Sequence, residues 1–380
     1  MIESLSPRIL GNMSAALALW DQMAGENDLV GGLPQSAAWV RNWHDHANAD
    51  CFVAALYDSE TPVLLLPLEV VKSGSIRFAR FPGGTHANCN FPVLARDHAA
   101  EIGRSDIRSL TRAIRQARPD IDALLLSRQV DLLEGFSNPL LHLDKTRNPN
   151  PVLSASLSCG FDAVTERSNA KRKRKKHRQH ARRYEEAGGH RIVTATSAAE
   201  ATAMLDRFFA MKAERFAKTG VTDVFADAGV RKFFRSIFGE AAGNEPDTFE
   251  MKALEVAGRS RAIIGKSYWM DGLTVEFGGI AEDEFVSASP GEFLFFEDIM
   301  QACQDGMAVY SFGIGDEPYK RDWCDIEQPL YDSMVGFTLK GRSYVAAYRV
   351  RNAAAAAIKK NARLWAVAKK LRGLHARKHS

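Results

Sequence analysis

The chain has 380 residues, of which 46% are hydrophobic and 25% are charged, so it has the composition of a soluble globular protein and a length that favours two domains. Its five scattered cysteines show no metal-ligand spacing and indicate no disulfide framework, which favours a reducing, cytoplasmic location. No segment reaches the ~18 apolar residues of a membrane span, and the N-terminus lacks a signal-peptide pattern.

The net charge of +4 conceals an uneven distribution of charge. Residues 171–183 carry nine Lys or Arg and no acid, and the last 48 residues carry twelve and no acid. The rest of the chain therefore has a net charge of −17. An acidic body with two basic segments directs attention to partners that carry phosphate or other anionic groups.

The first 150 residues alternate between helical and strand patterns. Apolar residues at helical spacing predict helices, and short apolar runs bounded by turn residues predict strands. We expect helices over 34–47 and 99–117, and strands over 51–58, 62–71, 76–84 and 122–129. This order indicates a mixed α/β domain, and the polar, Pro-rich segment 144–151 is the best linker candidate.

The second half has a similar order of elements, without a repeat at the level of residues. A long helix is expected over 161–187, ended by a Gly pair, followed by a strand over 190–196 and helices over 198–218 and 228–242. Consecutive antiparallel strands are expected between 248 and 282, with a hairpin turn at Asp271-Gly272. A helix from 289 and a strand over 308–315 complete this half.

The stretch SASPGEFLFFEDIMQACQDG, residues 287–306, gives the most specific local signal. Ser289 is placed as an N-cap, with Pro290 at the first helical position and Glu292 three residues after the cap, which is the pattern of a capping box. Gly291 would let a ligand approach the backbone amides of the first turn, where a pyrophosphate can bind. The alternative is a capped core helix, and Glu292 favours it by competing for those amides. The residues expected to pack on the sheet are Phe293, Phe296, Met300 and Cys303.

The next stretch, AVYSFGIGDEPYKRDW, ends a strand and places polar groups at its carboxyl end. Ligands of α/β sheets gather at such strand ends. An acid, a phenol and an amine close together suit proton transfer and phosphate contact, although a polar turn with a structural tyrosine would look the same. The residues concerned are Asp316, Glu317, Tyr319, Lys320, Arg321 and Trp323.

Together these features resemble the GNAT-superfamily acetyltransferases of the CelD-like group, which are associated with bacterial cellulose and exopolysaccharide biosynthesis. Members show an S-P-G helix start and then a D-F-G-x-G-D-x-x-Y-K-x-x-W stretch. This chain has YSFGIGDEPYKRDW, with Ser311 where Asp is usual. The resemblance covers about residues 155–345 and extends to the N-terminal half. The matching positions are Gly315, Asp316, Tyr319, Lys320 and Trp323.

The resemblance implies an α/β (α+β) fold of two tandem GNAT-like units, as in the related Fem-type transferases. Each unit would be a mixed, mostly antiparallel sheet flanked by helices. The expected domains are an N-terminal GNAT-like unit over 1–150, a C-terminal acyltransferase unit over 151–345 and a basic helical tail over 346–380.

The resemblance also implies a site in which acetyl-CoA or another acyl-CoA lies between two splayed central strands, without a metal. The implied donor-binding residues are Gly278 and Gly279 on a strand, Ser289, Pro290 and Gly291 at the helix start, and Lys320. The implied catalytic residues are Tyr319 as acid, and Asp316 or Glu276 as base.

The implied function is direct N- or O-acetyl transfer from acyl-CoA to an amine or hydroxyl of a small molecule or glycan precursor, in polysaccharide or cell-envelope biosynthesis. Two alternatives stay open: Fem-like transfer from aminoacyl-tRNA, and a non-catalytic scaffold of exopolysaccharide assembly. A Cys–His nucleophile in the loop 83–91 is disfavoured, because His86 and Cys89 have no orienting third group at a recognisable spacing.

The basic segments leave alternatives open. The run at 171–183 belongs to a helix. It is a solvated face, a contact surface for donor phosphates or an anionic acceptor, or a contact for nucleic acid. A contact with tRNA is the weakest of these interpretations, because no RNA- or DNA-reading motif accompanies the charge. The Ala-rich tail predicts a helix with Leu364, Val367 and Leu371 on one side. Such a helix either makes peripheral contact with an anionic membrane or docks on the acidic body of the protein.

Overall fold

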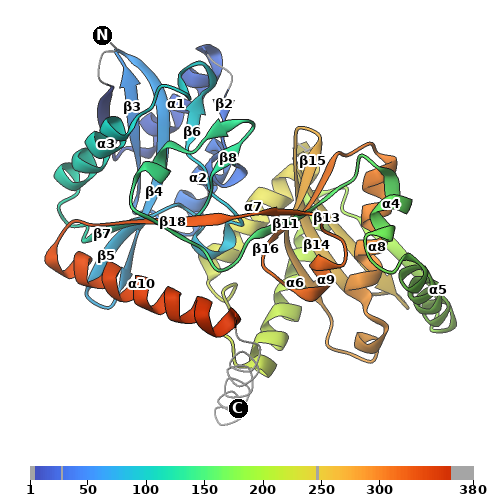
Figure 1. Cartoon of the computed structure of the whole chain (residues 1–380). Helices are drawn as coiled ribbons and strands as arrows, with labels where there is room; N and C mark the ends of the chain where they lie inside the picture. Colours follow the sequence, from blue (N-terminus) through green and yellow to red (C-terminus); the bar gives the residue numbers. More distant parts are fainter. Residues whose placement is uncertain (1–4, 27–28, 245–247, 361–380) are drawn as a thin grey trace. The chain divides into compact units, whose positions relative to one another are not determined.

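The computed structural model describes residues 5–26, 29–244 and 248–360, which form two compact units. The first unit contains the described residues up to Asn150 and those from Pro329 to Lys360, and the second is Pro151–Gln328 (Figure 1). Each unit is a sheet flanked by helices, so the expected mixed α/β fold is confirmed. None of the helices in these described ranges is long and apolar enough to cross a membrane.

The sheet of the first unit is antiparallel except where β5 meets β7. In sheet order its strands are β1 (Ser6–Leu10), β3 (Cys51–Asp58), β4 (Thr61–Ser73), β5 (Ile76–Arg80), β7 (Ala123–Val130), β18 (Leu330–Gly336) and β10 (Lys145–Arg147), and β2 (Leu29–Val30) and β6 (Val93–Ala95) extend it beside β4. A separate short ribbon pairs β8 (Leu132–Leu133) with β9 (Phe136–Ser137). The helices are α1 (Met13–Glu26), α2 (Ala37–His46), α3 (Arg104–Ala117) and α10 (Leu339–Lys360).

The sheet of the second unit is antiparallel except where β15 meets β16. In sheet order its strands are β12 (His190–Thr194), β13 (Phe249–Val256), β14 (Arg259–Trp269), β15 (Gly272–Ile280), β16 (Val309–Ile314), β11 (Val152–Ser156) and β17 (Ile326–Gln328). The helices are α4 (Gly160–Glu166), α5 (Ala170–Glu186), α6 (Ala198–Thr219), α7 (Ala228–Asn244), α8 (Pro290–Gln304) and α9 (Pro318–Arg321).

The two sheets have the same topology, although their sequences show no repeat. In each, four antiparallel strands end in a helical crossover, α3 or α8, to a parallel fifth strand. The sixth strand is supplied by a distant part of the chain: β18 follows the whole second unit, and β11 directly follows the first. The protein is thus built from two tandem units of one topology.

After Gln328 the chain returns to the first unit. The expected domains, a second unit over 151–345 and a tail over 346–380, therefore differ from those of the structure. β18 pairs with β7 and β10, and α10 packs on the same sheet, where Val345 joins a cluster that includes Phe78 and Met334. A strand and a helix with buried contacts in the first unit belong to that unit, so α10 is not a separate tail. The expected apolar side at Leu364, Val367 and Leu371 lies outside the described residues.

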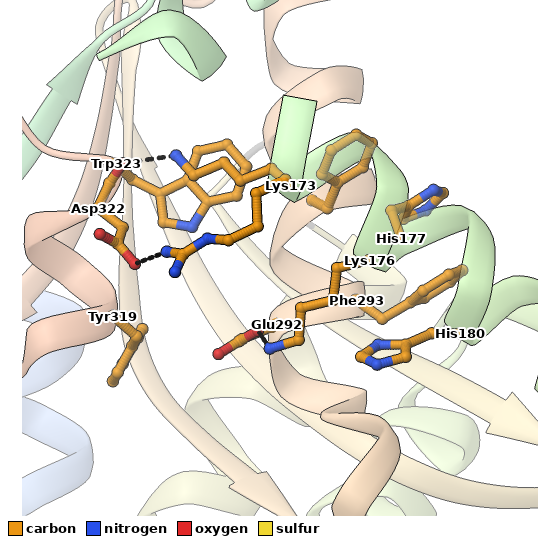
Figure 2. A pocket seen from close by; sticks show the side chains of 11 residues that line it. Lys173, Lys176, His177, His180, Glu292, Phe293, Tyr319, Asp322 and Trp323 are labelled. Atoms are coloured by element: carbon orange, nitrogen blue, oxygen red, sulfur yellow. Dashed lines mark hydrogen bonds and ion pairs between the residues drawn. The ribbon is translucent and has the colours of Figure 1, made fainter. Parts of the chain in front are cut away.

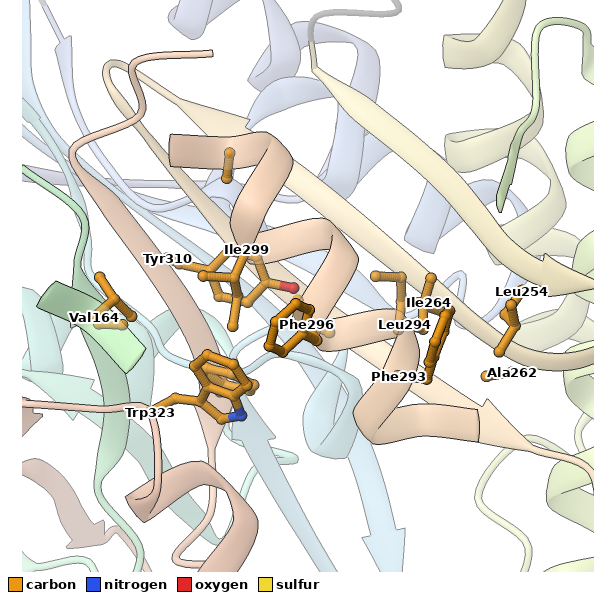
Figure 3. Packing of buried hydrophobic residues seen from close by; sticks show 14 of the residues in the cluster. Val164, Leu254, Ala262, Ile264, Phe293, Leu294, Phe296, Ile299, Tyr310 and Trp323 are labelled. Atoms are coloured by element: carbon orange, nitrogen blue, oxygen red, sulfur yellow. The ribbon is translucent and has the colours of Figure 1, made fainter. Parts of the chain in front are cut away.

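Helix α8 covers the second sheet through a continuous hydrophobic cluster (Figure 3). Phe293 and Phe296 are buried as expected, whereas Met300 and Cys303 are only half-buried. The buried face is wider than expected and also includes Leu294, Asp298, Ile299 and Ala302. This packing fixes the start of α8 against the sheet.

Two local predictions for this unit need correction. The helix expected over 161–187 is two helices, because α4 ends at Glu166 and Asn169 caps a new helix by accepting a hydrogen bond from Arg172 N at 2.9 Å. The hairpin between β14 and β15 is confirmed, but its turn residues are Met270 and Asp271, one position earlier than expected. The interruption between α4 and α5 changes the direction of the chain, and α5 then crosses the start of α8.

Candidate functional site

Strands β15 and β16 separate at the centre of the second sheet. They pair in parallel only where Gly272–Thr274 faces Val309–Ser311, and the ladder ends there although both strands continue. A register shift against β14 leaves Glu276 opposite no residue, and its carboxylate accepts a hydrogen bond from Ser267 Oγ at 2.6 Å. Such a bulge bends a strand, and here it lies just beyond the end of the parallel ladder. Because the two strands run in the same direction, their carboxyl ends lie at one edge of the sheet.

Gly278 and Gly279 lie in this last part of β15. A Cβ atom at 279 would be 3.0 Å from the ring of Phe208 on α6, which is shorter than ordinary contacts, so packing alone already favours glycine there. A Cβ atom at 278 would meet Ile264 at 3.4 Å, which is close to an ordinary contact. Packing therefore accounts for the glycine at 279 better than for the glycine at 278, and Gly278 is the better candidate for close approach by a ligand.

The start of α8 differs from the expected capping box. Ser289 has φ 47° and ψ 58°, in the left-handed region, and its side chain accepts no hydrogen bond from the first turn. A side-chain cap needs an extended backbone at the N-cap, and Glu292 pairs with Lys176 of α5 instead of reaching back. The capping-box prediction is therefore wrong, although Pro290 does stand at the first helical position. A Cβ atom at Gly291 would lie 3.0 Å from a side chain of β15, so the backbone approaches the sheet closely there.

Tyr319 lies on α9, directly after β16. Its ring stacks on Phe295 with centroids 5.8 Å apart and meets Phe312 edge-on at 6.3 Å. Burial, followed by the charge of Glu317, raises the pKa of the phenol well above its ordinary value, so the phenol is protonated at neutral pH. Among the described residues, none forms a hydrogen bond with its hydroxyl. The Tyr319 hydroxyl is therefore a proton donor without a hydrogen-bond acceptor among the described residues.

Asp316 and Lys320 are engaged by their own loop. Asp316 is exposed, and its Oδ1 accepts a hydrogen bond from Arg321 Nε at 2.6 Å. Lys320 is buried, donates to the carbonyl oxygen of Ile314 at 2.8 Å and lies 3.0 Å from the Glu317 carboxylate. These contacts hold the connection between β16 and α9, so the geometry assigns Lys320 a structural contact rather than a free charge.

A cavity of about 460 Å³ lies between α5, the start of α8 and the α9 segment (Figure 2). The side on α5 is basic and consists of Arg172, Lys173, Lys176, His177 and His180. The other sides carry aromatic rings and two acids, from Glu292, Phe293, Phe296, Tyr319, Asp322 and Trp323. The cavity thus joins the start of α8 to the protonated phenol.

Lys173 is the most constrained cation of the cavity. Its ammonium group lies 3.8 Å from the centre of the Trp323 ring and donates to the carbonyl oxygen of Asp322 at 2.5 Å. Burial lowers the pKa of Lys173 to about 8, against the opposing charge of Asp322. Arg172 lies 3.9 Å from the Asp322 carboxylate. Lys173 is therefore partly shielded from solvent, whereas Arg172 is exposed.

The two histidines of the cavity have different environments. His177 stacks on Phe296 with centroids 4.1 Å apart, and its Nε2 lies 2.6 Å from Glu297. His180 is 8% exposed, and no described residue forms a hydrogen bond with its ring. Burial, reinforced by the charge of Lys176, lowers the pKa of His180, so its imidazole is neutral at neutral pH. A buried neutral imidazole without a partner is available to a ligand.

A second cavity, of about 340 Å³, lies under the C-terminal half of α8. Asp298 accepts hydrogen bonds there from Lys252 at 2.7 Å, Lys266 at 2.8 Å and the Tyr310 hydroxyl at 2.7 Å, and Glu250 lies 2.8 Å from Lys266. Each charge has an opposite charge beside it, so we interpret this network as part of the core. Over the described ranges, no three or more His, Cys, Asp or Glu side chains form a group that could hold a metal ion.

The structure brings together only some of the residues expected from the sequence. Tyr319 shares a cavity with the first turn of α8, and Glu276 and Gly278 lie on β15 beyond the ladder. The cationic side of the cavity was not expected residue by residue. Lys173, His177 and His180 are spaced by four and three residues, so they lie on the face of α5 that lines the cavity. Because Lys and Arg occur on all sides of this helix, the sequence alone did not show which face lines a site.

A family model described as an acetyltransferase (GNAT) domain matches residues 171–321. The match begins in α5 and ends with α9, so it contains β12 to β16, α8 and the residues that line the cavity except Asp322 and Trp323. Residues 171–321 are thus similar to a GNAT-type acetyltransferase domain. The separating strands β15 and β16 and the helix start between them lie within this matched segment.

Two solved structures are similar in fold to most of this chain. The C-terminal domain (DUF2156) of a protein described as a lysylphosphatidylglycerol synthetase from Agrobacterium fabrum is 13% identical, with a TM-score of 0.51, and the match covers 90% of this chain and 96% of that one. FemX is 10% identical, with a TM-score of 0.53, and the match covers 86% and 98%. No curated protein matches the sequence. At these identities the similarity concerns the fold alone, and it extends over both units.

Proposed function

We propose that this protein is a cytoplasmic acyl-CoA-dependent acyltransferase that transfers an acetyl or longer acyl group to an amine or hydroxyl. The acceptor is a small molecule or glycan precursor, in polysaccharide or cell-envelope biosynthesis, as in the CelD-like group that the sequence resembles. The GNAT domain supports acyl transfer from an acyl-CoA. The acceptor class rests on the resemblance of the motif at residues 311–323.

One observation carries this proposal: the first turn of α8, through Glu292 and Phe293, lines a single cavity together with Tyr319. In the chain the helix follows β15 and the tyrosine follows β16, and these two strands stop pairing after Thr274. The pantetheine arm would pair with the edge of β15 beyond Thr274, where Gly278 allows close approach. The pyrophosphate would lie at the start of α8, where backbone amides and the helix dipole favour an anion and no Ser289 cap intervenes.

The reaction is direct transfer in a ternary complex. The acceptor nitrogen or oxygen attacks the thioester carbonyl, the C–S bond breaks as the tetrahedral intermediate collapses, and the CoA thiolate takes its proton from the Tyr319 hydroxyl. The proton of the acceptor passes to a base. Glu276 is better suited to this role than Asp316, because Glu276 lies on β15 at the bulge whereas Asp316 is exposed and paired with Arg321.

Calorimetric titration with acetyl-CoA and longer acyl-CoAs tests the proposal, followed by a panel of amino sugars and hydroxyl acceptors assayed for thiol release. We expect binding of acyl-CoA and acceptor-dependent release of CoA. The variant Gly278→Val should lose donor binding, because its side chain occupies the expected path of the pantetheine. Gly11→Val is the matched control, since a Cβ atom at Gly11 meets nothing within 4 Å. A protein that binds no CoA would leave the aminoacyl-tRNA and scaffold alternatives.

A further inference from the structure

Helix α5 has an outer face that takes no part in the cavity. His180 and Tyr184 are buried on its inner side, whereas the opposite side presents exposed cations spaced by four, three and four positions. At about 1.5 Å per residue they form a nearly straight row ~16 Å long. We call this set the outer row, and it consists of Lys171, Lys175, Arg178 and Arg182.

The packing of α5 does not depend on the outer row. Among the described residues, none forms a hydrogen bond or an ion pair with any of its four cations. The contacts with other elements come from side chains beside the row: Arg174 lies 2.6 Å from Asp162 on α4, and Arg183 donates to Ser287 Oγ at 2.9 Å. The charge of the outer row is therefore not compensated within the part of the chain that the structure describes.

The charges of α5 also oppose the formation of the helix. Its first turn contains no acid, although the helix dipole favours negative charge there, and the outer row places like charges one turn apart, where they repel. Helix α6 has the favourable arrangement, with Glu200 in its first turn, Lys218 in its last, and Glu214 3.1 Å from Lys218. Natural proteins break such local rules mainly at functional sites. The outer row is therefore better explained by an anionic partner than by the stability of the helix.

The composition of this face favours a membrane surface over other anionic partners. Proteins that bind nucleic acid without reading its sequence combine cations with aromatic rings on which bases stack, and the aromatic residues of α5 lie on its inner side. A protein partner is held mainly by aromatic and other well-packed anchors near the centre of the contact, and the outer row has none. An anionic bilayer needs neither, because its lipids diffuse toward a row of cations and each Lys or Arg adds to the attraction.

We propose that the outer row of α5 is a contact surface for an anionic phospholipid membrane, at which the protein acts as a peripheral protein. Helix α5 lies at the periphery of the second unit, beside α4 and α8 (Figure 1). No residue of the row is apolar, so the contact is electrostatic and reversible, without insertion into the bilayer. The inference goes beyond the proposed function, because it concerns where the protein acts and requires no acyl-CoA.

Sedimentation of the full chain with vesicles tests the proposal. The wild type should bind vesicles of phosphatidylcholine mixed with phosphatidylglycerol but not phosphatidylcholine alone. Salt at about 1 M should release it, because the Debye length falls from about 10 Å at 0.1 M to about 3 Å. The affinity should fall about 10²-fold or more when the four charges are removed together. That variant combines Lys171→Gln, Lys175→Gln, Arg178→Gln and Arg182→Gln.

Two further proteins separate charge from folding and from net charge. Exchanging Lys for Arg and Arg for Lys within the outer row keeps its charge and should keep the wild-type affinity. The glutamine variant should be at least as stable as the wild type in thermal unfolding, because repulsion between like charges is removed. The matched control loses the same net charge from exposed cations on separate elements that form no ion pair with any described residue, and it should bind nearly as tightly as the wild type. Its substitutions are Arg41→Gln on α2, Lys72→Gln on β4, Lys232→Gln on α7 and Arg259→Gln on β14.

The proposal would be overturned by a wild type that binds anionic vesicles no better than phosphatidylcholine, or by an outer-row variant that keeps the wild-type affinity. Equal losses in the outer-row variant and the control would show that net charge alone decides binding. Binding of tRNA that depends on the outer row, without binding of vesicles, would identify nucleic acid as the partner instead. None of these outcomes bears on the acyltransferase proposal, which the titration with acyl-CoA tests separately.

Discussion

Lys266 donates a hydrogen bond of 2.8 Å to the carboxylate of Asp298 in the interior of the second unit, where the side chains are 2% and 0% exposed. Lys252 binds the same oxygen from the neighbouring strand at 2.7 Å. Removing one member of such a buried group leaves charges that water cannot reach, which costs about 3–5 kcal/mol. This connection between α8 and the sheet underlies the first prediction.

Asp298→Ala should lower the free energy of unfolding of the second unit by about 3 kcal/mol or more, because two lysines lose their shared carboxylate. Urea unfolding followed by tryptophan fluorescence measures the change. Asp316→Ala is the matched control: its pair with Arg321 is exposed, so its loss should change stability by about 1 kcal/mol or less. Equal losses in the two variants would contradict the interpretation of the network as part of the core.

The same network predicts how stability depends on pH. Burial alone would raise the pKa of Asp298 and of Glu250, but the neighbouring lysines outweigh it and lower both values. A carboxyl group with a lowered folded-state pKa contributes stability above its unfolded pKa, and the contribution is lost as the pH falls through the folded value. The second unit should therefore lose stability below about pH 4, and Asp298→Ala should lose less over that range. Parallel losses in both proteins would contradict this.

Ser289→Ala should change the free energy of unfolding by about 0.5 kcal/mol or less, because the Ser289 side chain does not cap α8. Ser197→Ala is the comparison, since Ser197 caps α6 of the same unit by accepting a hydrogen bond from Glu200 N at 3.3 Å, and loss of a cap costs about 1 kcal/mol. Ser289→Gly should be at least as stable as the wild type, because glycine adopts the left-handed backbone freely. A loss of about 1 kcal/mol in Ser289→Ala would show a cap in solution.

Local pattern predicted the elements whose partners follow closely in the sequence. The strands between 248 and 282 and the helix from 289 were found because hairpins and amphipathic helices show in short windows. The sixth strands β11 and β18 were not assigned, since they are short and β18 pairs with β7, about two hundred residues earlier. The expected end of the second unit at 345 was wrong for the same reason.

Prediction of the site from the sequence has the same limit, since local features were found and contacts between distant residues were not. The SPG motif located the start of α8 and the following stretch located Tyr319, because helix starts and strand ends are local features. The left-handed backbone of Ser289 and the pairing of Glu292 with Lys176, 116 residues away, depend on how α5 crosses α8. A residue type alone cannot show which carboxylate a lysine will meet.

Tyr319→Phe should lower turnover by about 10²-fold or more, because a general acid is lost, and leave the Kd for CoA within about threefold. The ring contacts with Phe295 and Phe312 are kept in this variant, so the fold should not change. Thiol release and calorimetric titration measure the two effects. Unchanged turnover would remove Tyr319 from the reaction, whereas equal losses of turnover and affinity would indicate a role in binding.

The last prediction concerns Lys173, whose pKa is lowered to about 8 by burial, with Arg172 and Arg167 lowering it further and Asp322 and Cys324 opposing them. Below this pH the ammonium adds a positive charge to the cavity, and above it that charge is lost. The phosphates of CoA are fully ionised throughout, since their last pKa is about 6, and His180 is already neutral because its pKa is lowered.

The affinity for CoA should therefore fall about tenfold between pH 7 and pH 9, as one charge-assisted contact disappears. Lys173→Arg keeps its charge over this range and should bind CoA with little dependence on pH, and Lys173→Met should bind weakly at both values. Calorimetry at constant ionic strength measures all three proteins. A wild-type affinity that does not change with pH, or a Lys173→Arg protein with the wild-type pH dependence, would show that this lysine does not face the donor.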